Sequence, residues 1–348
     1  MSTELDINSF LEKAKHLPVI DVRSPQEFEH GHIPTAVNIH LFNNEERARV
    51  GTLYKQTGRQ AAIAEGFDIV GPKMKSFVTD AQKISVNNEV LVHCWRGGMR
   101  STNFAWLLNT YGIKARTLEK GYKAYRNYVL EFFSKPIQLL VLGGETGSGK
   151  TEILKQLAQA GEQVVDLEKL AHHKGSSFGA LGEEKQPTGE QFENNLFAEW
   201  ENLDFSKPVW IEDEAKNIGK VFLPNALWQK MKAAPIIRIR VPKKERINKL
   251  VEGYGKFDKK DLQSAIVRIE KRLGGEALKK ALDALESNNL AEVADITLYY
   301  YDKAYNHDHE KRSFVNVHFV EAQSTSAEKN AELILSFVKQ KRELIQEI

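Results

Sequence analysis

Residues 137–151 read IQLLVLGGETGSGKT, an apolar run that leads into a glycine-rich loop. The first six of these residues have the length and composition of a buried strand, and apolar residues recur at helical spacing after the loop. The spacing from Gly144 to Gly149, Lys150 and Thr151 matches the pattern G-x-x-x-x-G-K-[ST], which needs a strand before it and a helix after it. The stretch therefore predicts a phosphate-binding loop, or P-loop, in a parallel α/β sheet.

The residue types in this loop suit the binding of phosphate. Glycines let the backbone N–H groups close around a diphosphate, and the N-terminus of the following helix adds partial positive charge. Lys150 would neutralise an outer phosphate, and Thr151 would ligate Mg²⁺ if the site uses a metal, although no metal ligand is certain from the motif. The predicted phosphate-binding residues are Gly144, Glu145, Thr146, Gly147, Ser148, Gly149, Lys150 and Thr151.

A run of three carboxylates, Glu212, Asp213 and Glu214, follows an apolar strand that is predicted over 209–211. The carboxyl end of a parallel strand beside a P-loop is where Mg²⁺ or an attacking group is held. A solvated acidic turn is the alternative, because short acidic runs are common on protein surfaces. The sequence leaves open which of the three carboxylates points inward.

The other reactive stretch is residues 91–101, LVHCWRGGMRS, which holds the only cysteine of the chain, Cys94. Apolar residues before the cysteine predict a strand, the next four residues a tight turn, and 101–108 a helix. Such a turn forms a bowl of backbone donors that favours a thiolate, with Arg96 and Arg100 on its rim. The candidate catalytic residues are therefore Cys94, Arg96 and Arg100. A buried structural cysteine is the alternative.

Composition limits the broad class of the protein. A length of 348 residues suits about two domains, each with its own core. The net charge is only +2, so any attraction to a polyanion must come from local clusters of positive charge. A single cysteine excludes an intramolecular disulfide. The sequence shows no signal segment and no apolar run of membrane length, so we expect a cytoplasmic protein without a membrane partner.

The N-terminal part carries a second long motif, residues 21–39, DVRSPQEFEHGHIPTAVNI. It predicts a strand, a Ser-Pro helix start, a short helix and another strand, as in a parallel α/β sheet. Together with the loop at Cys94, this motif resembles the rhodanese family of sulfurtransferases, which carry sulfur as a persulfide on that cysteine. For Asp21 and Arg23 in this motif we favour a buried ion pair that braces the fold over a direct role in catalysis.

The length of the cysteine loop bears on its chemistry. Six residues run from Trp95 to Arg100, whereas a related phosphatase family has a loop one residue longer that fits a phosphate. We therefore favour sulfur-like chemistry over the hydrolysis of phosphate esters. Between the two rhodanese motifs, residues 66–73 predict a glycine-rich loop, which either covers the substrate or serves as a surface connection.

We expect a rhodanese-like domain over 1–134 and a P-loop domain over 135–348, with a helical C-terminal part that includes an amphipathic helix over 327–348. Residues 230–272 hold fourteen cationic and five acidic side chains. This excess fits a phosphate backbone, and a solvated helical face is the alternative. An aromatic cluster follows, formed by Tyr299, Tyr300, Tyr301 and Tyr305. These side chains would either stack on bases or belong to a core or an edge strand.

The segment 172–179, HHKGSSFG, has two open interpretations. Its histidine pair lacks the spaced partners of a zinc site, so we reject zinc. Its Lys-Gly-Ser-Ser cluster would bind a second anion or form a plain loop.

The order of the motifs is more specific than either motif alone. The stretches 92–101 VHCWRGGMRS, 143–151 GGETGSGKT, 172–179 HHKGSSFG, 186–193 QPTGEQFE and 211–219 IEDEAKNIG together resemble the tRNA 2-selenouridine synthase family over essentially the whole chain. The resemblance implies a tRNA substrate, contacted at its anticodon arm, with a 5-substituted 2-thiouridine at wobble position 34. Selenophosphate and geranyl diphosphate are the implied co-substrates, and an enzyme that supplies selenophosphate is the implied partner.

The resemblance also implies roles for the two loops. The P-loop would grip the diphosphate of geranyl diphosphate, with Lys150 stabilising the leaving charge, although the same loop would also suit a nucleoside triphosphate or a tRNA phosphate. Cys94 would carry selenium as a selenylsulfide or otherwise assist its transfer, with Arg96 and Arg100 holding selenophosphate. One alternative is a persulfide sulfurtransferase coupled to an ATP-dependent P-loop domain. Another is a regulatory RNA-binding module.

Overall fold

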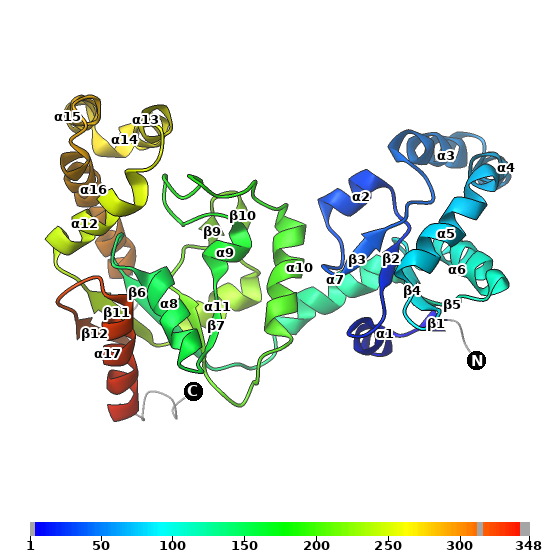
Figure 1. The fold of residues 1–348 in the computed structure, drawn as a ribbon, viewed down its shortest axis with the longest axis horizontal. Helices are drawn as coiled ribbons and strands as arrows, with labels where there is room; N and C mark the ends of the chain where they lie inside the picture. The colour runs from blue at the N-terminus through cyan, green and yellow to red at the C-terminus, as the bar shows by residue number, and fades with distance from the viewer. Residues whose placement is uncertain (1–3, 312–315, 342–348) are drawn as a thin grey trace. The chain divides into compact units, whose positions relative to one another are not determined.

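The computed structural model describes residues 4–311 and 316–341, and Figure 1 shows a mixed α/β chain. The chain forms two compact units. The first comprises Met1–Phe132 with Glu193–Ala198, and the second comprises Phe133–Phe192 with Glu199–Ile348. Parallel sheets in both units confirm the predicted fold class. The domain boundary at residue 134 stays a prediction.

The first unit is built on a five-stranded sheet in the order β1-β5-β4-β2-β3, and all of its strand pairs are parallel. Its strands are β1 (Glu4–Leu5), β2 (Val19–Asp21), β3 (Ala36–Asn38), β4 (Glu89–His93) and β5 (Lys114–Leu118). Its helices are α1 (Ile7–Ala14), α2 (Pro25–His30), α3 (Asn44–Gln56), α4 (Arg59–Val70), α5 (Met74–Ile84), α6 (Met99–Tyr111) and α7 (Gly121–Phe132). The register pairs Asp21 with His93, so β2 and β4 end side by side just before Cys94.

The motif at 21–39 folds as its residues predict. Ser24 caps α2 in a reciprocal capping box with Glu27, and a proline occupies the first turn of the helix. Arg23 donates to the Asp21 carboxylate at 2.6 Å, and both side chains are fully buried. The expected structural ion pair is therefore confirmed, and its guanidinium also lies 3.8 Å from the centre of the Tyr122 ring.

The prediction of a loop over 66–73 was wrong. Helix α4 continues to Val70, a short 3-10 turn covers Gly71–Lys73, and α5 follows directly. Burial of Ala62 and Ile69 on one face of α4 carries the helix through Gly66. A glycine inside a helix costs only about 1 kcal/mol relative to alanine, which this packing offsets.

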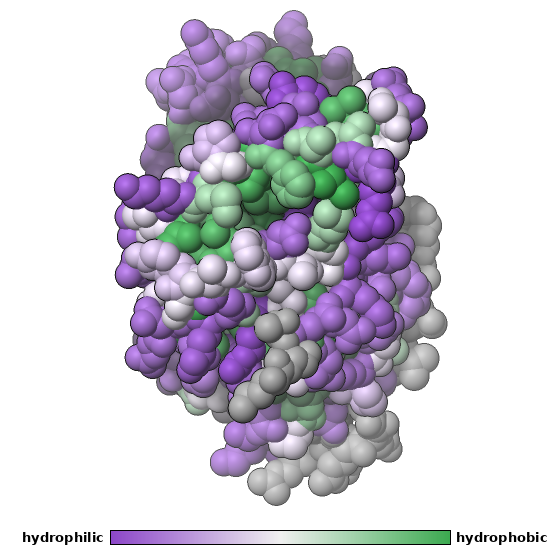
Figure 2. Space-filling view, turned by 90° about the vertical axis from the view of Figure 1, so that its right-hand side faces the viewer, coloured by the Kyte–Doolittle hydropathy of each residue, from purple (hydrophilic) through white to green (hydrophobic). Residues whose placement is uncertain are grey.

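The surface of the first unit exposes several large apolar side chains, of which Phe67, Trp106 and Tyr54 are the most exposed. Figure 2 shows an apolar area on the side of the molecule that faces the viewer. In the described part of the chain, no helix is long and apolar enough to span a membrane.

The second unit holds another parallel five-stranded sheet, in the order β12-β11-β6-β8-β7. Its strands are β6 (Leu139–Gly144), β7 (Gln163–Val165), β8 (Val209–Glu212), β11 (Ile236–Arg240) and β12 (Val317–Glu321), and a small antiparallel pair is formed by β9 (Asn217–Ile218) and β10 (Val221–Phe222). The helices among these strands are α8 (Lys150–Gln159), α9 (Leu167–Ala171), α10 (Gly189–Trp200), which contributes residues to both units, α11 (Asn225–Ala233) and α17 (Ala327–Gln340).

Five further helices of the second unit form a helical part with its own apolar core. They are α12 (Lys243–Tyr254), α13 (Lys259–Arg268), α14 (Glu270–Leu273), α15 (Gly275–Glu286) and α16 (Leu290–Lys311). The amphipathic C-terminal helix predicted over 327–348 is α17, and residues 342–348 of that prediction lie outside the described residues.

The four tyrosines lie on α16 and not on an edge strand. Tyr299 is exposed, the ring centres of Tyr300 and Tyr301 lie 5.1 Å apart, and Tyr301 and Tyr305 are half-buried and hydrogen-bonded. They therefore do not form one stacking surface.

Candidate functional site

Cys94 follows the last residue of β4, at the carboxyl edge of the first sheet, and α6 begins five residues later. Two glycines in the left-handed region shape this loop, Gly97 with φ +66° and Gly121 with φ +58°. A Cβ on Gly121 would lie 2.3 Å from the Cys94 carbonyl oxygen and 2.5 Å from the Gly97 nitrogen. The Tyr122 N–H donates to that same carbonyl at 2.8 Å. The cysteine loop is thus held against the start of α7.

The Cys94 thiol is buried, with only 2% of the residue exposed. Its Sγ lies 3.1 Å from the Ser101 hydroxyl and 3.8 Å from the Gly98 carbonyl oxygen. Within the described residues, the amides of Arg96, Gly97 and Gly98 donate to no protein acceptor, the sulfur included. These N–H groups therefore remain available to an anion placed over the loop.

The two arginines of this loop differ in their partners. Arg100 donates to a Glu27 carboxylate oxygen at 2.9 Å. Burial acts to raise the pKa of Glu27, but the charge of Arg100 and its hydrogen bond outweigh it and hold that pKa below the usual value. Arg96 is exposed and forms no ion pair with any described residue. Arg96 is therefore the arginine that is ready to bind an anion, whereas Arg100 is already neutralised.

His93, next to the cysteine, is fully buried and lies 3.8 Å from the Asp21 carboxylate. Burial lowers its pKa, although Asp21 acts in the opposite direction. The imidazole is therefore neutral near neutral pH and packs as a core group beside Tyr122.

The predicted P-loop connects β6 to α8 in the second unit. Gly147 and Gly149 both adopt left-handed backbone angles, with φ +81° and +87°. Lys150 donates to the Gly144 carbonyl oxygen at 3.1 Å, so its ammonium lies over the loop. The buried Ser148 hydroxyl has no hydrogen-bond partner among the described residues. The loop thus has the backbone and the cation that phosphate binding requires.

Three carboxylates lie close together beside the P-loop. Glu168 of α9, Glu212 at the end of β8 and Glu214 have oxygens that all lie within 4.8 Å of one another. The Thr151 hydroxyl donates to Glu168 at 2.9 Å and lies 3.4 Å from a Glu212 oxygen. A Cβ on Gly175 would lie 2.7 Å from both Glu214 oxygens, so the Lys-Gly-Ser-Ser loop packs against this cluster. Glu212 and Glu214 therefore point inward.

Sequence reasoning missed Glu168. Its signal was weak: the short strand β7 ends at Val165, and Asp166 caps α9 two residues before the glutamate. Because β7 pairs with β8 in parallel, the acidic residues that follow it lie at the same edge of the sheet as Glu212.

The electrostatics of the cluster favour a bound cation. Burial, followed by repulsion from Glu168, raises the pKa of Glu214 to about 8 and that of Glu212 well above its usual value. Burial acts to lower the pKa of Lys150, but Glu212 and the neighbouring carboxylates outweigh it and raise that pKa. One Glu212 oxygen is buried without a hydrogen-bond partner in the described part of the chain. These oxygen donors fit a hard divalent cation such as Mg²⁺.

Asp213 points away from the carboxylate cluster and accepts a hydrogen bond from the Tyr305 hydroxyl at 3.1 Å. The same hydroxyl accepts from the Gly144 N–H at 2.9 Å, and the Tyr305 ring lies 4.3 Å from the Arg238 guanidinium. A tyrosine of the helical part is thus bonded to the first glycine of the P-loop.

Arg246 of α12 holds the middle of the P-loop. It forms two hydrogen bonds of 2.9 Å with Asp302, donates to the Thr146 carbonyl oxygen and lies 3.4 Å from Glu145. Arg238 lies 3.7 Å from the same glutamate. The side chain of Glu145 therefore pairs with arginines, and only its backbone can serve a phosphate.

The basic stretch at 230–272 is not a single surface. Arg238 and Arg246 are buried against the P-loop, Lys243 pairs with Asp295 and Lys249 with Glu152. Besides the paired Lys243, the exposed cations of α12, α13, α14 and the turns between them are Lys244, Lys256, Lys259, Lys260, Arg268, Lys271 and Arg272. Residues 243–272 thus carry ten cationic against five acidic side chains, whereas the whole helical part, residues 243–311, is close to balanced with fourteen against thirteen.

Comparisons with known proteins agree with this geometry. A family described as the tRNA 2-selenouridine synthase AAA domain matches residues 137–333, and the rhodanese-like domain family matches residues 6–128. A tRNA 2-selenouridine synthase of Bdellovibrio bacteriovorus is 33% identical, over 84% of this chain and 88% of the relative. One of a Sulfurovum species is 35% identical, over 85% and 90%.

A further tRNA 2-selenouridine synthase, of Nitrosomonas europaea, is 38% identical. The match covers 68% of this chain and 63% of that relative. Both domain matches and near full-length similarity to these relatives lead to one conclusion. The chain belongs to the tRNA 2-selenouridine synthase family.

Proposed function

We propose that this protein converts a 5-substituted 2-thiouridine at wobble position 34 of tRNA to 2-selenouridine in two steps. Geranyl diphosphate first alkylates the sulfur, and selenophosphate then supplies selenium. The observation that carries the proposal is the P-loop, whose Lys150 lies beside three buried carboxylates, in a chain that also holds the cysteine loop at Cys94.

In the first step, the thiouridine sulfur attacks C1 of geranyl diphosphate. The S–C1 bond forms, the C1–O bond breaks, both electrons leave with diphosphate, and the base loses its N3 proton. The amides of the P-loop and the Lys150 ammonium would hold the departing diphosphate, where fixed positive charge stabilises the transition state. The carbonyl contact of Lys150 places its charge over the loop in advance.

In the second step, the selenium of selenophosphate attacks C2 of the S-geranyl base. The C2–Se bond forms, the C2–S bond breaks and geranylthiol departs with a proton. Water then cleaves the P–Se bond and releases phosphate. Unpaired amides at Arg96, Gly97 and Gly98, together with exposed Arg96, would hold the phosphate oxygens of the donor. The Cys94 thiol would assist the transfer by giving geranylthiol its proton, and the hydrolysis of the P–Se bond would return a proton to the thiolate.

Mg²⁺ is a proposed cofactor of the second unit. Glu168, Glu212, Glu214 and Thr151 would hold it through oxygen atoms, which are the ligands it prefers. When bound, the ion would supply positive charge to the diphosphate. Among this chain's own groups, Lys150 already balances part of the buried negative charge.

We place tRNA, contacted at its anticodon arm, against the exposed cations of α12–α14, because long-range attraction to a phosphate backbone needs positive charge at the surface. A separate enzyme would supply selenophosphate. A reducing compartment such as the cytoplasm would keep the thiol of Cys94 available.

Nucleoside mass spectrometry tests the proposal. The protein is incubated with 2-thiouridine tRNA and with geranyl diphosphate and selenophosphate, separately and together. We expect S-geranyl-2-thiouridine with geranyl diphosphate alone and 2-selenouridine only when both are present. Selenation without geranyl diphosphate, or the absence of both products, would overturn it.

A further inference from the structure

An apolar cavity opens beside the P-loop in the second unit. Helices α12, α13 and α16 and the loop at 176–178 form its walls, and Thr146 of the P-loop lies at its edge. Its empty volume is about 510 Å³, with open solvent at the mouth included, but only about 50 Å³ admits the centre of a water molecule. The cavity is therefore a narrow slot. Its larger lining side chains are Phe178, Leu250, Tyr254, Leu262, Leu290 and Tyr301.

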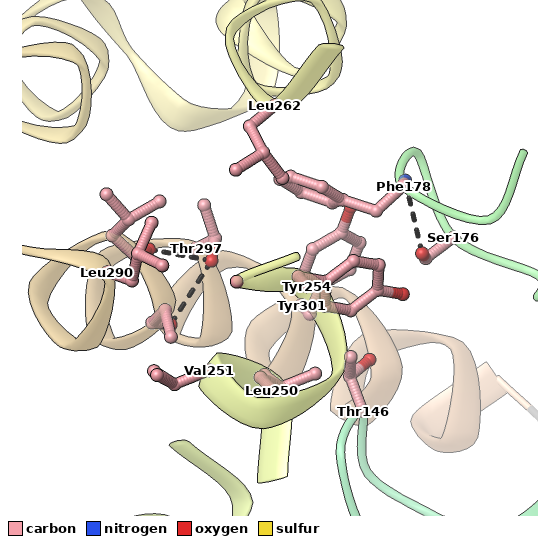
Figure 3. A pocket seen from close by; sticks show the side chains of 13 residues that line it. Thr146, Ser176, Phe178, Leu250, Val251, Tyr254, Leu262, Leu290, Thr297 and Tyr301 are labelled. Carbon is pink, nitrogen blue, oxygen red and sulfur yellow. Dashed lines mark hydrogen bonds between the residues drawn. The ribbon is translucent and has the colours of Figure 1, made fainter. Parts of the chain in front are cut away.

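The slot is continuous with the phosphate loop. A Cβ on Gly147 would lie 3.1 Å from Cγ of Leu250, so the P-loop backbone packs on a residue of the cavity wall. In Figure 3, Thr146 lies at one side of the cavity, and Leu290 and Leu262 lie away from it. A ligand anchored at the P-loop would extend between these aromatic and aliphatic side chains.

Apart from the Thr146 hydroxyl at the P-loop edge, the few polar side chains of the lining are hydrogen-bonded within the protein. The Thr297 hydroxyl donates to the Val293 carbonyl oxygen of its own helix at 2.8 Å. The Ser176 hydroxyl accepts from the Phe178 N–H at 3.2 Å and is also hydrogen-bonded to Tyr254.

The Tyr301 hydroxyl also accepts from the Ser177 N–H at 3.3 Å. A nucleobase site needs donors and acceptors directed at the base edge, whereas a hydrocarbon needs none. The lining therefore suits a hydrocarbon better than a base.

We propose that this cavity binds the hydrocarbon chain of a prenyl diphosphate whose diphosphate occupies the P-loop. The inference rests on the proposed function and deepens it, because it gives the chain of geranyl diphosphate a binding site and makes the cavity the determinant of chain length. Aliphatic side chains at Leu262 and Leu290 would limit how long a chain fits. Burial of each CH₂ group strengthens binding by a factor of about four.

Calorimetric titration of the full chain with Mg²⁺ tests the inference. The probes are inorganic diphosphate, dimethylallyl diphosphate, geranyl diphosphate and ATP. We expect affinity to rise with chain length, so that geranyl diphosphate binds at least about 100-fold more tightly than diphosphate. Ala294→Phe, which fills the slot, should remove this preference and leave diphosphate binding intact, which shows that the variant is folded. Ala291→Phe, on an exposed position of the same helix, should match the wild type.

Several results would overturn the inference. Equal affinity for geranyl diphosphate and inorganic diphosphate would do so, as would an Ala294→Phe variant that loses ATP binding while it keeps the preference for a geranyl chain. The proposed function is judged separately by the products on tRNA. If the wild type binds geranyl diphosphate by chain length but never geranylates tRNA, the cavity assignment holds and the proposed function fails. If the wild type geranylates tRNA but binds the diphosphates without any preference for chain length, the proposed function holds and the cavity assignment fails.

Discussion

The cysteine loop and the P-loop are built alike and surrounded differently. Each follows a buried parallel strand, each turns through glycines in the left-handed region, and each leads into a helix. Around Cys94, the loop's ion-pair partner among the described residues is Glu27, and three amides of the loop have no protein acceptor there. Among the described residues, side chains from α9, α12, α16, β8 and β11 form hydrogen bonds or ion pairs with the P-loop. The backbone of each loop is thus encoded locally, whereas the charge around the P-loop depends on residues far along the chain.

The difference is clearest in the partners of one arginine beside each loop. Arg100 pairs with a carboxylate that already caps α2, so one local motif serves the other. Arg246 instead ties together α16, through Asp302, and two residues of the P-loop. We infer that the cysteine loop responds most to changes in its backbone, and the P-loop to changes in distant charges.

The largest expected effect is that of Gly121→Ala. The new Cβ would lie 2.3 Å from the Cys94 carbonyl oxygen, at a backbone angle that costs a non-glycine residue about 1–3 kcal/mol. We expect selenation to fall at least about 100-fold while geranylation stays within about twofold. Rates of the two steps, measured separately by nucleoside mass spectrometry, check this.

Gly98→Ala is the matched control for that substitution. Its φ of −98° suits any residue, and no atom lies within 4 Å of the added Cβ. Both rates should stay close to those of the wild type. A loss as large as that of Gly121→Ala would show that the loop is sensitive to any side chain, and not to this close approach.

Arg246→Met should have the next largest effect. The change leaves the carboxylates of Asp302 and Glu145 without their main cation, and both are mostly buried. Loss of one partner of a fully buried pair costs about 3–5 kcal/mol, and partial exposure reduces this to about 2 kcal/mol. Calorimetry should show diphosphate binding weakened about tenfold. Lys243→Met removes a half-exposed pair from the same helix and should change binding less than twofold.

The smallest effect concerns pH, which should act on the two units in opposite directions. Burial holds the pKa of His93 in the folded protein below its ordinary value of 6.5. As pH falls, the unfolded chain therefore binds a proton at this histidine before the folded chain does. The first unit thus loses stability as pH falls below about 6.5. Glu214 has a folded pKa of about 8 against an ordinary value of 4.5, so the second unit loses stability as pH rises between them. Each group contributes at most about 1.4 kcal/mol per pH unit.

Hydrogen exchange without divalent cations, followed in peptides of each unit from pH 5.5 to 8, measures both slopes at once. His93→Leu should flatten the slope of the first unit and leave that of the second unchanged. Slopes of the same sign in the two units would contradict the account.

Sequence patterns predicted the fold class and both loops because strands, glycines and helix starts are local features. They also predicted the buried pair of Asp21 and Arg23, which lie two residues apart. They did not predict that residues 66–73 are helical, because the burial of Ile69 that carries α4 through Gly66 is a tertiary effect.

Contacts between distant parts of the chain could not be predicted at all. Tyr305 bonds to Gly144 across 161 positions, and Glu168 joins the carboxylates of β8 only after the sheet has formed. For the same reason, the sequence did not decide that Glu212 and Glu214 are the two carboxylates that point inward. Spacing in sequence gives the residue types of a site, and packing decides which of them face it.

The most direct test of the account is one product analysis of two variants, Lys150→Ala and Cys94→Ser, with 2-thiouridine tRNA and both co-substrates. We predict that Cys94→Ser accumulates S-geranyl-2-thiouridine and forms no 2-selenouridine. We predict that Lys150→Ala forms neither product from 2-thiouridine tRNA, yet converts tRNA geranylated beforehand to 2-selenouridine. Wild-type geranylation by Lys150→Ala, or its loss in Cys94→Ser, would contradict the division of the two steps between the two loops.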